Sequence, residues 1–383
     1  MTRRESLLTG LGIAAMAHAR PEQSHRVAII GYTGHGNFGH AWDLAWNGLP
    51  TVQVVAVSDP DPAGRTAAQK RSGALRSYAD YRQMLDRERP GIVNIACRWA
   101  DERLPMFRAA VEIGAHILVE KPFAPSLPVA DQMVDLAARK GIKVAVGHQA
   151  RASANARSIH RMIAEGRIGE IVELRARGKE DARAGGEDLI VLGTHSLDLM
   201  RFFVGDPRWV SAHVTQDGRE ITPRDGHQGT ERIGLLAGNQ IAAEFVFDNA
   251  LPVTFASRKS LPIPPGEHCG LTLLGTRGAI FINVGTSRSA QAWIVRSPLW
   301  AEGEAPRWEA LGPEGPDTVG NFDRASHAMA ADFIDAIDHN REPVCNARDG
   351  CWTIEMIAGV YNSQFSQQRV RFPLRDRRDP FQS

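Results

Sequence analysis

This chain of 383 residues has few cysteines, almost no excess of positive over negative charge, and no long apolar run. The 45 basic and 44 acidic residues leave a formal net charge of +1, which does not indicate binding to nucleic acid or to an anionic membrane surface. No apolar run reaches the roughly 20 residues of a transmembrane helix, so no stable membrane insertion is expected. With 43% apolar and 23% charged residues, the composition is typical of a soluble globular protein.

The four cysteines, Cys97, Cys269, Cys345 and Cys351, show no spacing that is typical of a metal site. No bound metal is therefore expected. Cys345 and Cys351 are near enough in sequence to pair in an oxidising compartment, but unpaired thiols are the interpretation that we favour.

Residues 1–19 contain the three parts of a bacterial signal peptide in the right order. Arg3 and Arg4 come first, a mildly apolar stretch covers residues 7–17, and Ala17-His18-Ala19 is a small-x-small cleavage site. The arginine pair followed by leucines is similar to the twin-arginine type of leader. The sequence thus predicts an exported, periplasmic protein, and a disordered basic tail is the alternative.

A nucleotide-binding loop follows the leader. Val27–Ile30 has the pattern of a buried parallel strand, residues 34–39 spell GxGxxG, and helical spacing of apolar residues begins at Ala41. A second apolar strand, Val52–Val57, ends just before Asp59, twenty residues beyond the last glycine. In this context the glycines let the backbone approach a pyrophosphate, and the acid binds a ribose diol.

The predicted cofactor is NAD, because Asp59 would repel the 2′-phosphate of NADP. Arg65 lies near enough in sequence to keep NADP as a minority alternative. Gly31-Tyr32-Thr33-Gly34 makes the turn wider than the common form, so the glycine that touches phosphate stays open. The residues predicted to bind the cofactor are Gly31, Gly34, Gly36, Asn37, Phe38, Gly39, Asp59, Glu120, Lys121 and Pro122.

Strand and helix patterns alternate over residues 20–147, which predicts an α/β, doubly wound Rossmann domain with a parallel sheet. Residues 148–383 change to one helix, Ala154–Glu165, and then long strands with hairpin-like links. This half is predicted to be an α+β domain with a mostly antiparallel open sheet. The stretch 298–320, rich in Pro, Gly and Glu, is predicted to be a long surface loop.

The segment GAHILVEKPFAPSLPVADQMVDLAARKGIKVAVGHQAR resembles the Gfo/Idh/MocA oxidoreductase family, whose signature is EKP after a Rossmann strand. IAEGRIGEI at 163–171, GTHSLDLMRFFVGDP at 193–207 and GTRGAIFI at 275–282 also match, so the resemblance covers nearly the whole mature chain. It implies a sugar, cyclitol or related polyol as substrate. It also implies a homo-oligomer, either a dimer or a tetramer.

Oxidation of a carbinol needs a base within hydrogen-bond reach of the hydroxyl. The resemblance implies Lys121 and His195 for this role. Burial beside a cationic nicotinamide would lower the pKa of Lys121, and Lys121-Pro122 is predicted to be a cis peptide. Thr194 is predicted to cap a helix from about His195 to Val204, whose positive end would keep the imidazole neutral.

Two positions depart from the family pattern. An aspartate commonly stands four residues before the histidine, on the same helical face, where this chain has Val191. Asp188, seven residues before His195, is expected on that same face, and either Asp188 or the adjacent Glu187 is a candidate substitute. The alternative is that this chain has abandoned the usual relay. Arg98, Trp99 and Glu102 stand where many members carry a proline and a histidine. The residues predicted to bind substrate are Trp99, Gln149, Arg151, Lys179 and His195.

Three functions are compatible with these patterns. The first is a nicotinamide-dependent oxidoreductase that acts on a sugar hydroxyl, with a tightly bound cofactor that is recycled. The second is a redox-neutral glycosidase or lyase, in which transient oxidation enables elimination and the hydride then returns. The third is a non-catalytic sugar- or nucleotide-binding protein. Export disfavours a gene regulator, and the presence of Lys121 and His195 disfavours an inactive enzyme.

Overall fold

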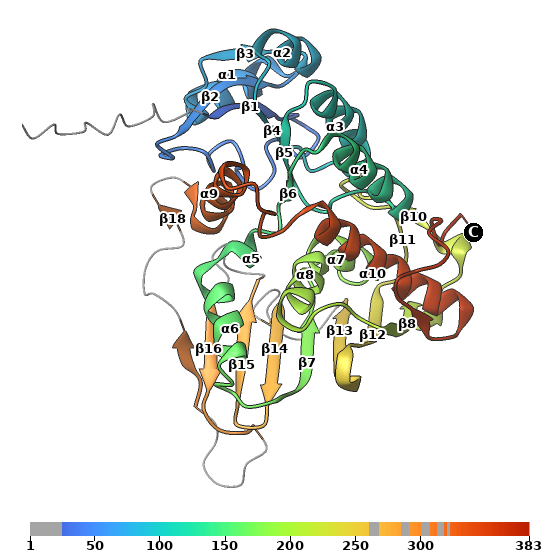
Figure 1. Ribbon diagram of the computed structural model, residues 1–383. Coiled ribbons are helices and arrows are strands. Elements are labelled where there is room, and N and C mark those ends of the chain that lie inside the picture. The colour runs from blue at the N-terminus through green and yellow to red at the C-terminus, as the bar shows by residue number, and fades with distance from the viewer. Residues whose placement is uncertain are drawn as a thin grey trace, which may run out of the picture.

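The computed structural model describes residues 25–259, 268–284, 291–299, 307–311, 318–319 and 322–382. The predicted leader, residues 1–19, and most of the predicted loop 298–320 lie outside these ranges. Figure 1 shows two sheets stacked end to end, with helices between them and around the first sheet.

Six parallel strands form the first sheet in the order β3-β2-β1-β4-β5-β6. The order reverses between β1 and β4, and ligands of such sheets bind at the carboxyl ends of the strands beside this reversal. The predicted doubly wound domain is confirmed. Its elements are β1 (His25–Ile30), β2 (Val52–Ser58), α1 (Pro62–Ser72), β3 (Arg76–Tyr78), α2 (Tyr81–Glu88), β4 (Ile92–Ile95), α3 (Arg103–Glu112), β5 (His116–Val119), α4 (Leu127–Lys140) and β6 (Val144–Val146).

The helix predicted to follow the glycine loop is wrong, because residues 38–48 form consecutive turns instead. Asn37 and Ala41 have φ angles of 54° and 59°, and Gly39 has 59°, so the left-handed conformation interrupts any α-helix there. The turns bring His40 and Trp42 to a buried carboxylate, that of Glu120. A tertiary contact therefore overrides the local helical pattern.

The second sheet follows the order β17-β16-β15-β14-β7-β13-β12-β8-β20, and β9 pairs with β8. Only β7 and β13 run parallel among its paired strands in the described residues, which confirms the mostly antiparallel prediction. Helices α6, α8 and α10 pack on one face of this sheet (Figure 1).

The bounds of this half follow the chain. The helices are α5 (Gln149–Ala152), α6 (Ala154–Ala164), α7 (Gly186–Val191), α8 (Gly193–Val204), α9 (Arg324–Asp338) and α10 (Ala347–Ser366). The strands are β7 (Ile171–Arg177), β8 (Trp209–Gln216), β9 (Arg219–Glu220), β10 (His227–Gln228), β11 (Leu235–Leu236), β12 (Gln240–Val246), β13 (Pro252–Arg258), β14 (Gly270–Gly275), β15 (Gly278–Asn283), β16 (Ala292–Val295), β17 (Glu309–Leu311), β18 (Thr318–Val319), β19 (Phe322–Asp323) and β20 (Val370–Arg371). Short 3₁₀ turns cover Ala100–Glu102, Pro223–Asp225 and Asp248–Ala250.

Helix α10 joins the two halves, because it packs on α4 and β6 of the first and on α8 and β8 of the second. Helix α9 also returns to the first half, where His327 Nδ1 lies 3.1 Å from the carbonyl oxygen of Ala45. The C-terminal segments thus fix the angle at which the second sheet meets the strand ends of the first.

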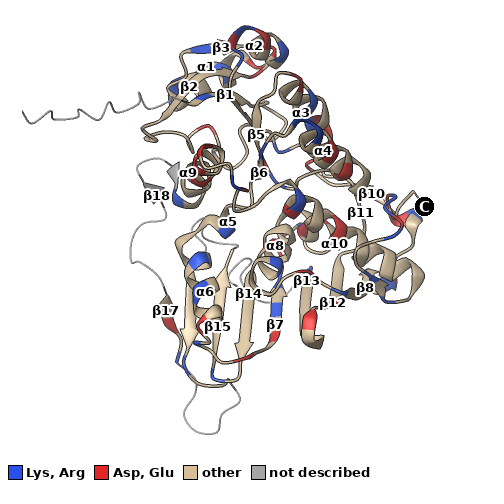
Figure 2. Ribbon diagram, viewed as in Figure 1, with Lys and Arg blue, Asp and Glu red and all other residues tan. Residues whose placement is uncertain are grey.

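Charges of both signs are scattered over both halves (Figure 2). This agrees with the small net charge of the sequence. All four cysteines are buried and unpaired, as favoured from their pattern. Within the ranges that the structure describes, no helix combines the length and the apolar character needed to cross a membrane.

Candidate active site

The glycine-rich loop after β1 closes on itself through its backbone. The N–H groups of Tyr32 and Asn37 each donate to the carbonyl of the other at 3.0 Å, and Gly34 N–H donates to Asn37 Oδ1 at 3.0 Å. Gly36 has a φ of 82°, and a Cβ there would collide with Arg98 at the end of β4. Only glycine therefore lets the loop lie this close to the neighbouring strand end.

Glu120 anchors the far end of this loop and is completely buried. Its Oε2 accepts hydrogen bonds from the backbone of His40 (3.1 Å), the ring of His40 (2.7 Å) and Trp42 Nε1 (2.9 Å). Its Oε1 accepts the Lys121 N–H at 2.7 Å. Burial alone would raise the pKa of Glu120, but His40 and Lys121 lower it to about 2. Glu120 thus anchors the glycine loop as an ionised group, and a Cβ on Gly39 would collide with it.

Asp59, at the end of β2, is turned toward the same loop and is fully buried. Its carboxylate accepts hydrogen bonds from Thr33 N–H (3.1 Å), Thr33 Oγ1 (2.7 Å) and Asp61 N–H (3.0 Å). The Arg65 guanidinium donates to the backbone carbonyl of Asp59 at 2.7 Å. The predicted acid therefore lies beside the glycine loop, and Thr33 is a partner that the sequence pattern did not indicate. Phe38 packs beneath Gly31 in the same loop.

Lys121 follows β5 and is almost completely buried, at 2% exposure. The predicted cis peptide with Pro122 is present. Its Nζ donates to the backbone carbonyl of Val191, the last residue of α7, at 2.8 Å. Burial lowers the pKa of Lys121 to about 8, although Glu120 and Glu231 act in the opposite direction. The amine is thus a base that can be neutral near physiological pH.

His195 is the third residue of α8 and is also buried. Its ring meets the ring of His148 edge on, with centroids 5.6 Å apart. Burial and the nearby charge of Lys121 hold the pKa of His195 well below its usual value. The predicted Thr194 cap is wrong, because the helix begins at Gly193 after Leu192 and no side chain caps it. The imidazole is neutral, but mainly because it is buried.

Asp188 does not share a helix face with His195. The chain bends at Leu192 (φ −113°, ψ −36°), so Asp188 belongs to α7 and His195 to α8. The Asp188 carboxylate accepts from the N–H groups of Lys179 (3.1 Å) and Glu180 (3.0 Å) and from Ser257 Oγ (2.7 Å). Those three bonds turn it toward the strand ends of the second sheet, and no contact joins it to Lys121.

The other predicted substrate residues lie in different surroundings. Trp99 stacks on His35 with ring centroids 3.9 Å apart, and Gln149 is buried with no partner for its Oε1 among the described residues. Arg151 is buried and bonded to Asp198 at 2.6 and 2.9 Å, which indicates a structural role. Lys179 is partly exposed and lies 3.7 Å from Asp181.

Behind His195, the side chains of His148, Asp198 and Cys345 come together in the interior. The Cys345 thiol lies 3.5 Å from Asp198 Oδ1 and 3.6 Å from His148 Nδ1. A His, Asp and Cys set suits a zinc-like ion in its chemistry. However, the two bonds from Arg151 already neutralise Asp198, and thiol hydrogen bonds account for the remaining contacts. We therefore assign this group as a hydrogen-bonded cluster that supports His148.

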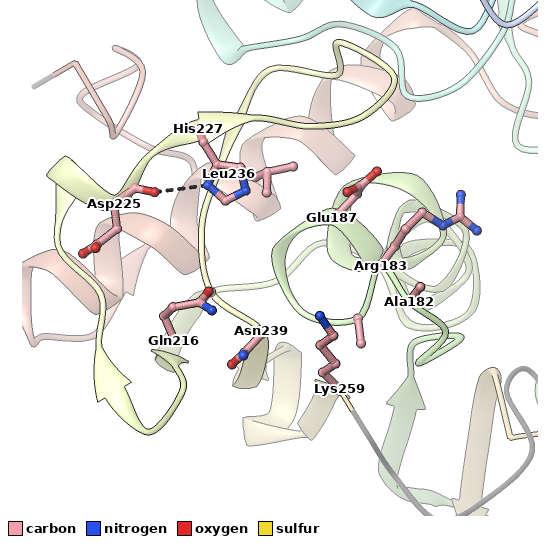
Figure 3. Close-up of a pocket in the computed structure, with 11 residues that line it drawn as sticks. Ala182, Arg183, Glu187, Gln216, Asp225, His227, Leu236, Asn239 and Lys259 are labelled. Atoms are coloured by element: carbon pink, nitrogen blue, oxygen red, sulfur yellow. Dashed lines mark hydrogen bonds between the residues drawn. The ribbon is translucent and has the colours of Figure 1, made fainter.

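A separate pocket of about 350 Å³ opens at the amino end of α7 (Figure 3). Arg183 and Lys259 line one side, and Asp225 and His227 lie on the other (Figure 3). Glu187 lines this pocket and accepts a hydrogen bond from Thr230. Neither Lys121 nor His195 lines the pocket, which is therefore distinct from the candidate active site.

Two features of the site had no signal in the sequence pattern. Arg103, completely buried at the start of α3, bonds four carbonyl oxygens around Lys121. In the second half, Glu231 lies 3.5 Å from Arg98, and Arg232 lies over the ring of Trp99 at 4.8 Å. Both features depend on which loops meet after folding.

Comparison with known proteins agrees with this geometry. Residues 25–148 match the model of the Gfo/Idh/MocA oxidoreductase family for its NAD-binding Rossmann fold, and residues 160–372 match that of its C-terminal alpha/beta domain. D-apiose dehydrogenase from Paraburkholderia graminis is 26% identical over 347 residues, which is 86% of each chain.

Solved structures show the same fold. Levoglucosan dehydrogenase in complex with NADH and L-sorbose superposes with a TM-score of 0.74 at 20% identity, over 92% of this chain and 100% of that one. Aldose-aldose oxidoreductase from Caulobacter crescentus, complexed with glycerol, has a TM-score of 0.70 at 18% identity, over 91% and 100%. With family matches over both halves, this chain belongs to the Gfo/Idh/MocA family of NAD-binding oxidoreductases.

Proposed function

We propose that this protein oxidises or reduces a hydroxyl-bearing carbon of a sugar or sugar derivative, with Lys121 as the acid–base residue. The observation that carries the proposal is the buried Lys121 amine, whose pKa of about 8 lets it give or take a proton near neutral pH. It follows β5 in a sheet whose carboxyl edge also holds the glycine loop. A base and a hydride acceptor are the two components that such a reaction requires.

The residues around the glycine loop fit NAD. Gly34 and Gly36 have φ angles of 87° and 82°, which place backbone rather than side chains along the loop. Asp59 sits at the end of β2, where the adenosine ribose of a dinucleotide would lie. When bound there, NAD supplies the group that accepts or returns a hydride at the substrate carbon.

The partner of Lys121 matters for its chemistry. A carbonyl oxygen accepts one N–H from Nζ, so a neutral amine can keep that bond while its lone pair takes the hydroxyl proton. A carboxylate at position 191 would instead hold a positive charge on the amine. The neutral ring of His195 is proposed to hydrogen-bond the same substrate oxygen. Asp188 is the weakest candidate for a catalytic role, because its carboxylate already accepts three hydrogen bonds.

A hydroxyl-rich substrate fits the polar atoms of this region. His148 Nε2, Gln149 Oε1 and His195 Nδ1 are buried and have no hydrogen-bond partner among the described residues. Such atoms are costly unless a ligand or water satisfies them. D-apiose dehydrogenase and levoglucosan dehydrogenase, both similar to this chain, act on carbohydrates according to their names.

A redox-neutral reaction is the second candidate, in which the hydride returns within one turnover. Val191 in place of an acid favours it, because the proton relay differs from the common family pattern. The fold is also shared with an enzyme named aldose-aldose oxidoreductase. A non-catalytic binding protein remains the third outcome of the experiment below.

The proposal also covers location and assembly. The leader at residues 1–19 supports export to the periplasm by the twin-arginine route. The family resemblance supports a homodimer or homotetramer in solution, which light scattering of the purified protein measures.

The decisive experiment incubates the purified protein with a panel of free sugars and glycosides, without added cofactor, and follows products by mass spectrometry. Net oxidation that requires added NAD supports the first function. Cleavage or isomerisation without net redox change supports the second. Binding without any product, with NAD supplied as well, would exclude both enzymatic functions.

A further inference from the structure

Four backbone carbonyl groups turn toward one side chain behind Lys121. Nε and Nη2 of Arg103 donate to the carbonyl of Cys97 at 3.2 and 3.1 Å, and Nη2 also donates to Arg98 at 2.7 Å. The same guanidinium donates to the carbonyl of Lys121 at 3.2 Å and to that of Pro122. Arg103 therefore ties the loop after β4 to the peptide that carries the base.

This contact lies beyond the sheet itself. The last ladder pair between β4 and β5 joins Ile95 to Val119, so backbone pairing ends before either loop begins. A planar guanidinium with five donors can span both loops at once, whereas a lysine ammonium at this place could not reproduce the fork. Arg103 thus determines how the two loops meet.

In the part of the chain that the structure describes, no carboxylate lies within salt-bridge distance of the Arg103 guanidinium. The Arg103 side chain is completely buried. An arginine remains protonated in proteins, so the guanidinium places a positive charge at the Lys121 carbonyl, 3.2 Å away, and this charge helps to lower the pKa of the Lys121 amine. Like charges in a buried site disfavour the ammonium form.

We propose that Arg103 is a positioning residue for the reaction: its fork fixes the Lys121-Pro122 peptide, and its charge favours the neutral amine of Lys121. The inference rests on the proposed function, in which Lys121 is the base. The charged and titratable groups that interact with Lys121 are Arg98, Arg103, Glu120, Glu231, His148 and His195. Among them, Arg103 combines hydrogen bonds to the Lys121-Pro122 peptide with a positive charge.

Two substitutions separate these roles. Arg103→Met removes both charge and fork, and Arg103→Lys keeps the charge but loses the fork. Arg108→Met is the matched control, because Arg108 is exposed on the same helix. We expect Arg103→Met to move the acid limb of the kcat profile to higher pH and to lower its plateau by about 10- to 100-fold. Arg103→Lys should lower the plateau with a smaller shift, and the control should match the natural protein.

A second measurement does not require turnover. The chain has six lysines, so the ¹⁵Nζ signal of Lys121 can be assigned by comparison with Lys121→Met and titrated directly. We expect its midpoint to rise by at least about half a unit in Arg103→Met. An unchanged midpoint together with an unchanged kcat plateau in both Arg103 variants would overturn the inference. Full activity of Lys121→Met would instead overturn the proposed function, while the titration would still test Arg103.

If Arg103→Met does not fold, Arg103→Lys carries the test through its kcat plateau and its Lys121 midpoint. A natural plateau in that variant contradicts the fork. Added guanidinium should also partly restore activity to Arg103→Ala if the missing group is the cause. Thermal unfolding of every variant is measured beside the kinetics, because a purely structural role would change the melting temperature without moving the pH limb.

Discussion

At the residue scale, the surroundings of each polar side chain determine its pKa and its role more than the residue type does. Lys121 has a carbonyl as partner and a pKa of about 8, whereas the Glu120 carboxyl one residue earlier has a pKa of about 2. The two groups are neighbours in sequence, but one faces α7 and the other faces the cofactor loop. One is therefore available as a base, and the other serves as an anchor.

The first prediction concerns pH. Because Lys121 must be neutral to accept a proton, kcat for oxidation should rise from pH 6.5 and level off above a midpoint of about 8. In the direction of reduction, where the ammonium donates the proton, kcat should fall through the same midpoint. Lys121→Met should remove about 100-fold or more of the rate in both directions. Initial rates across pH measure this, and equal limbs in the natural protein and Lys121→Met would contradict it.

His195 should affect the rate without adding a titration near its usual pKa. Burial and Lys121 keep its ring neutral well below pH 6.5, so it can only hydrogen-bond in the working range. We expect His195→Ala to lower kcat/KM by about 100-fold. The pH midpoint of the acid limb that Lys121 produces should stay unchanged or move to slightly lower pH. An acid limb near pH 6.5 that vanishes in His195→Ala would show that the ring is protonated during turnover.

Asp188 should matter for stability. Its three hydrogen bonds hold the turn at Lys179 and Glu180 against Ser257. In Asp188→Asn, the side-chain NH₂ would face one of these hydrogen-bond donors instead of accepting from it. We expect the free energy of unfolding to fall by about 1–3 kcal/mol, with the pH profile of kcat unchanged. Denaturant unfolding measures this, with Asp181→Asn as the control at a partly exposed neighbour. An altered pH limb with natural stability would restore the catalytic role.

These residues show what sequence patterns can and cannot predict here. Lys121, Glu120 and the glycines follow strand ends, and the order of strands along the chain fixes their place. Asp188 required knowledge of the bend at Leu192, and Arg103 required knowledge of where four carbonyl groups converge. Such contacts join segments far apart in sequence, and no local periodicity reports them.

At the element scale, the same contrast separates strands from loops. Buried parallel strands are continuous apolar runs, so β1 and β2 lie where the sequence predicts them. The segment 38–48 has helical spacing of apolar residues, but it forms turns because Glu120 binds His40 and Trp42. A buried carboxylate outweighs a weak helical preference, since leaving it unpaired costs several kcal/mol.

The contact between the two halves at Trp99 also belongs to this scale. Tyr32, His35 and Trp99 stack at centroid distances of 3.8 and 3.9 Å, and Arg232 of the second half covers Trp99. We call this stack the interdomain clasp. Tyr32 and His35 belong to the glycine loop, so Arg232 joins that loop to the second half through Trp99. We therefore expect release of a dinucleotide to require the clasp to open.

The clasp predicts a kinetic effect on cofactor release. A cation–π contact is worth about 0.5–1 kcal/mol at an exposed site, so Arg232→Ala should speed release of NAD by about two- to fivefold. Trp99→Ala removes the shared ring and should speed it further. Stopped-flow fluorescence with excess competing nucleotide measures the rate, and Arg224→Ala is the control on an exposed neighbouring turn. Equal release rates in all variants would mean that the clasp does not cover the nucleotide.

At the scale of the whole molecule, helix α10 and the clasp hold the two halves together at separate places. Lys121 follows β5 and the glycine loop follows β1, so both belong to the first half, whereas His195 lies in α8 of the second half. A cofactor that contacts both halves would stabilise both of them against unfolding. Retention of the cofactor is therefore a property of the entire chain.

The last prediction joins this architecture to the proposed leader at residues 1–19. A twin-arginine leader exports folded proteins, so NAD would be bound in the cytoplasm and carried across, and little free nucleotide would replace a lost molecule outside. We therefore expect the purified protein to retain NAD(H) through gel filtration, with a dissociation constant well below micromolar, where one micromolar corresponds to about −8.2 kcal/mol. Denaturation should release the nucleotide, as measured by absorbance and mass. Replacing Arg3 and Arg4 by lysine should keep the protein in the cytoplasm with its nucleotide still bound. An exported protein that is purified without nucleotide and needs millimolar NAD for turnover would contradict this prediction, because its cofactor would then bind weakly and be lost.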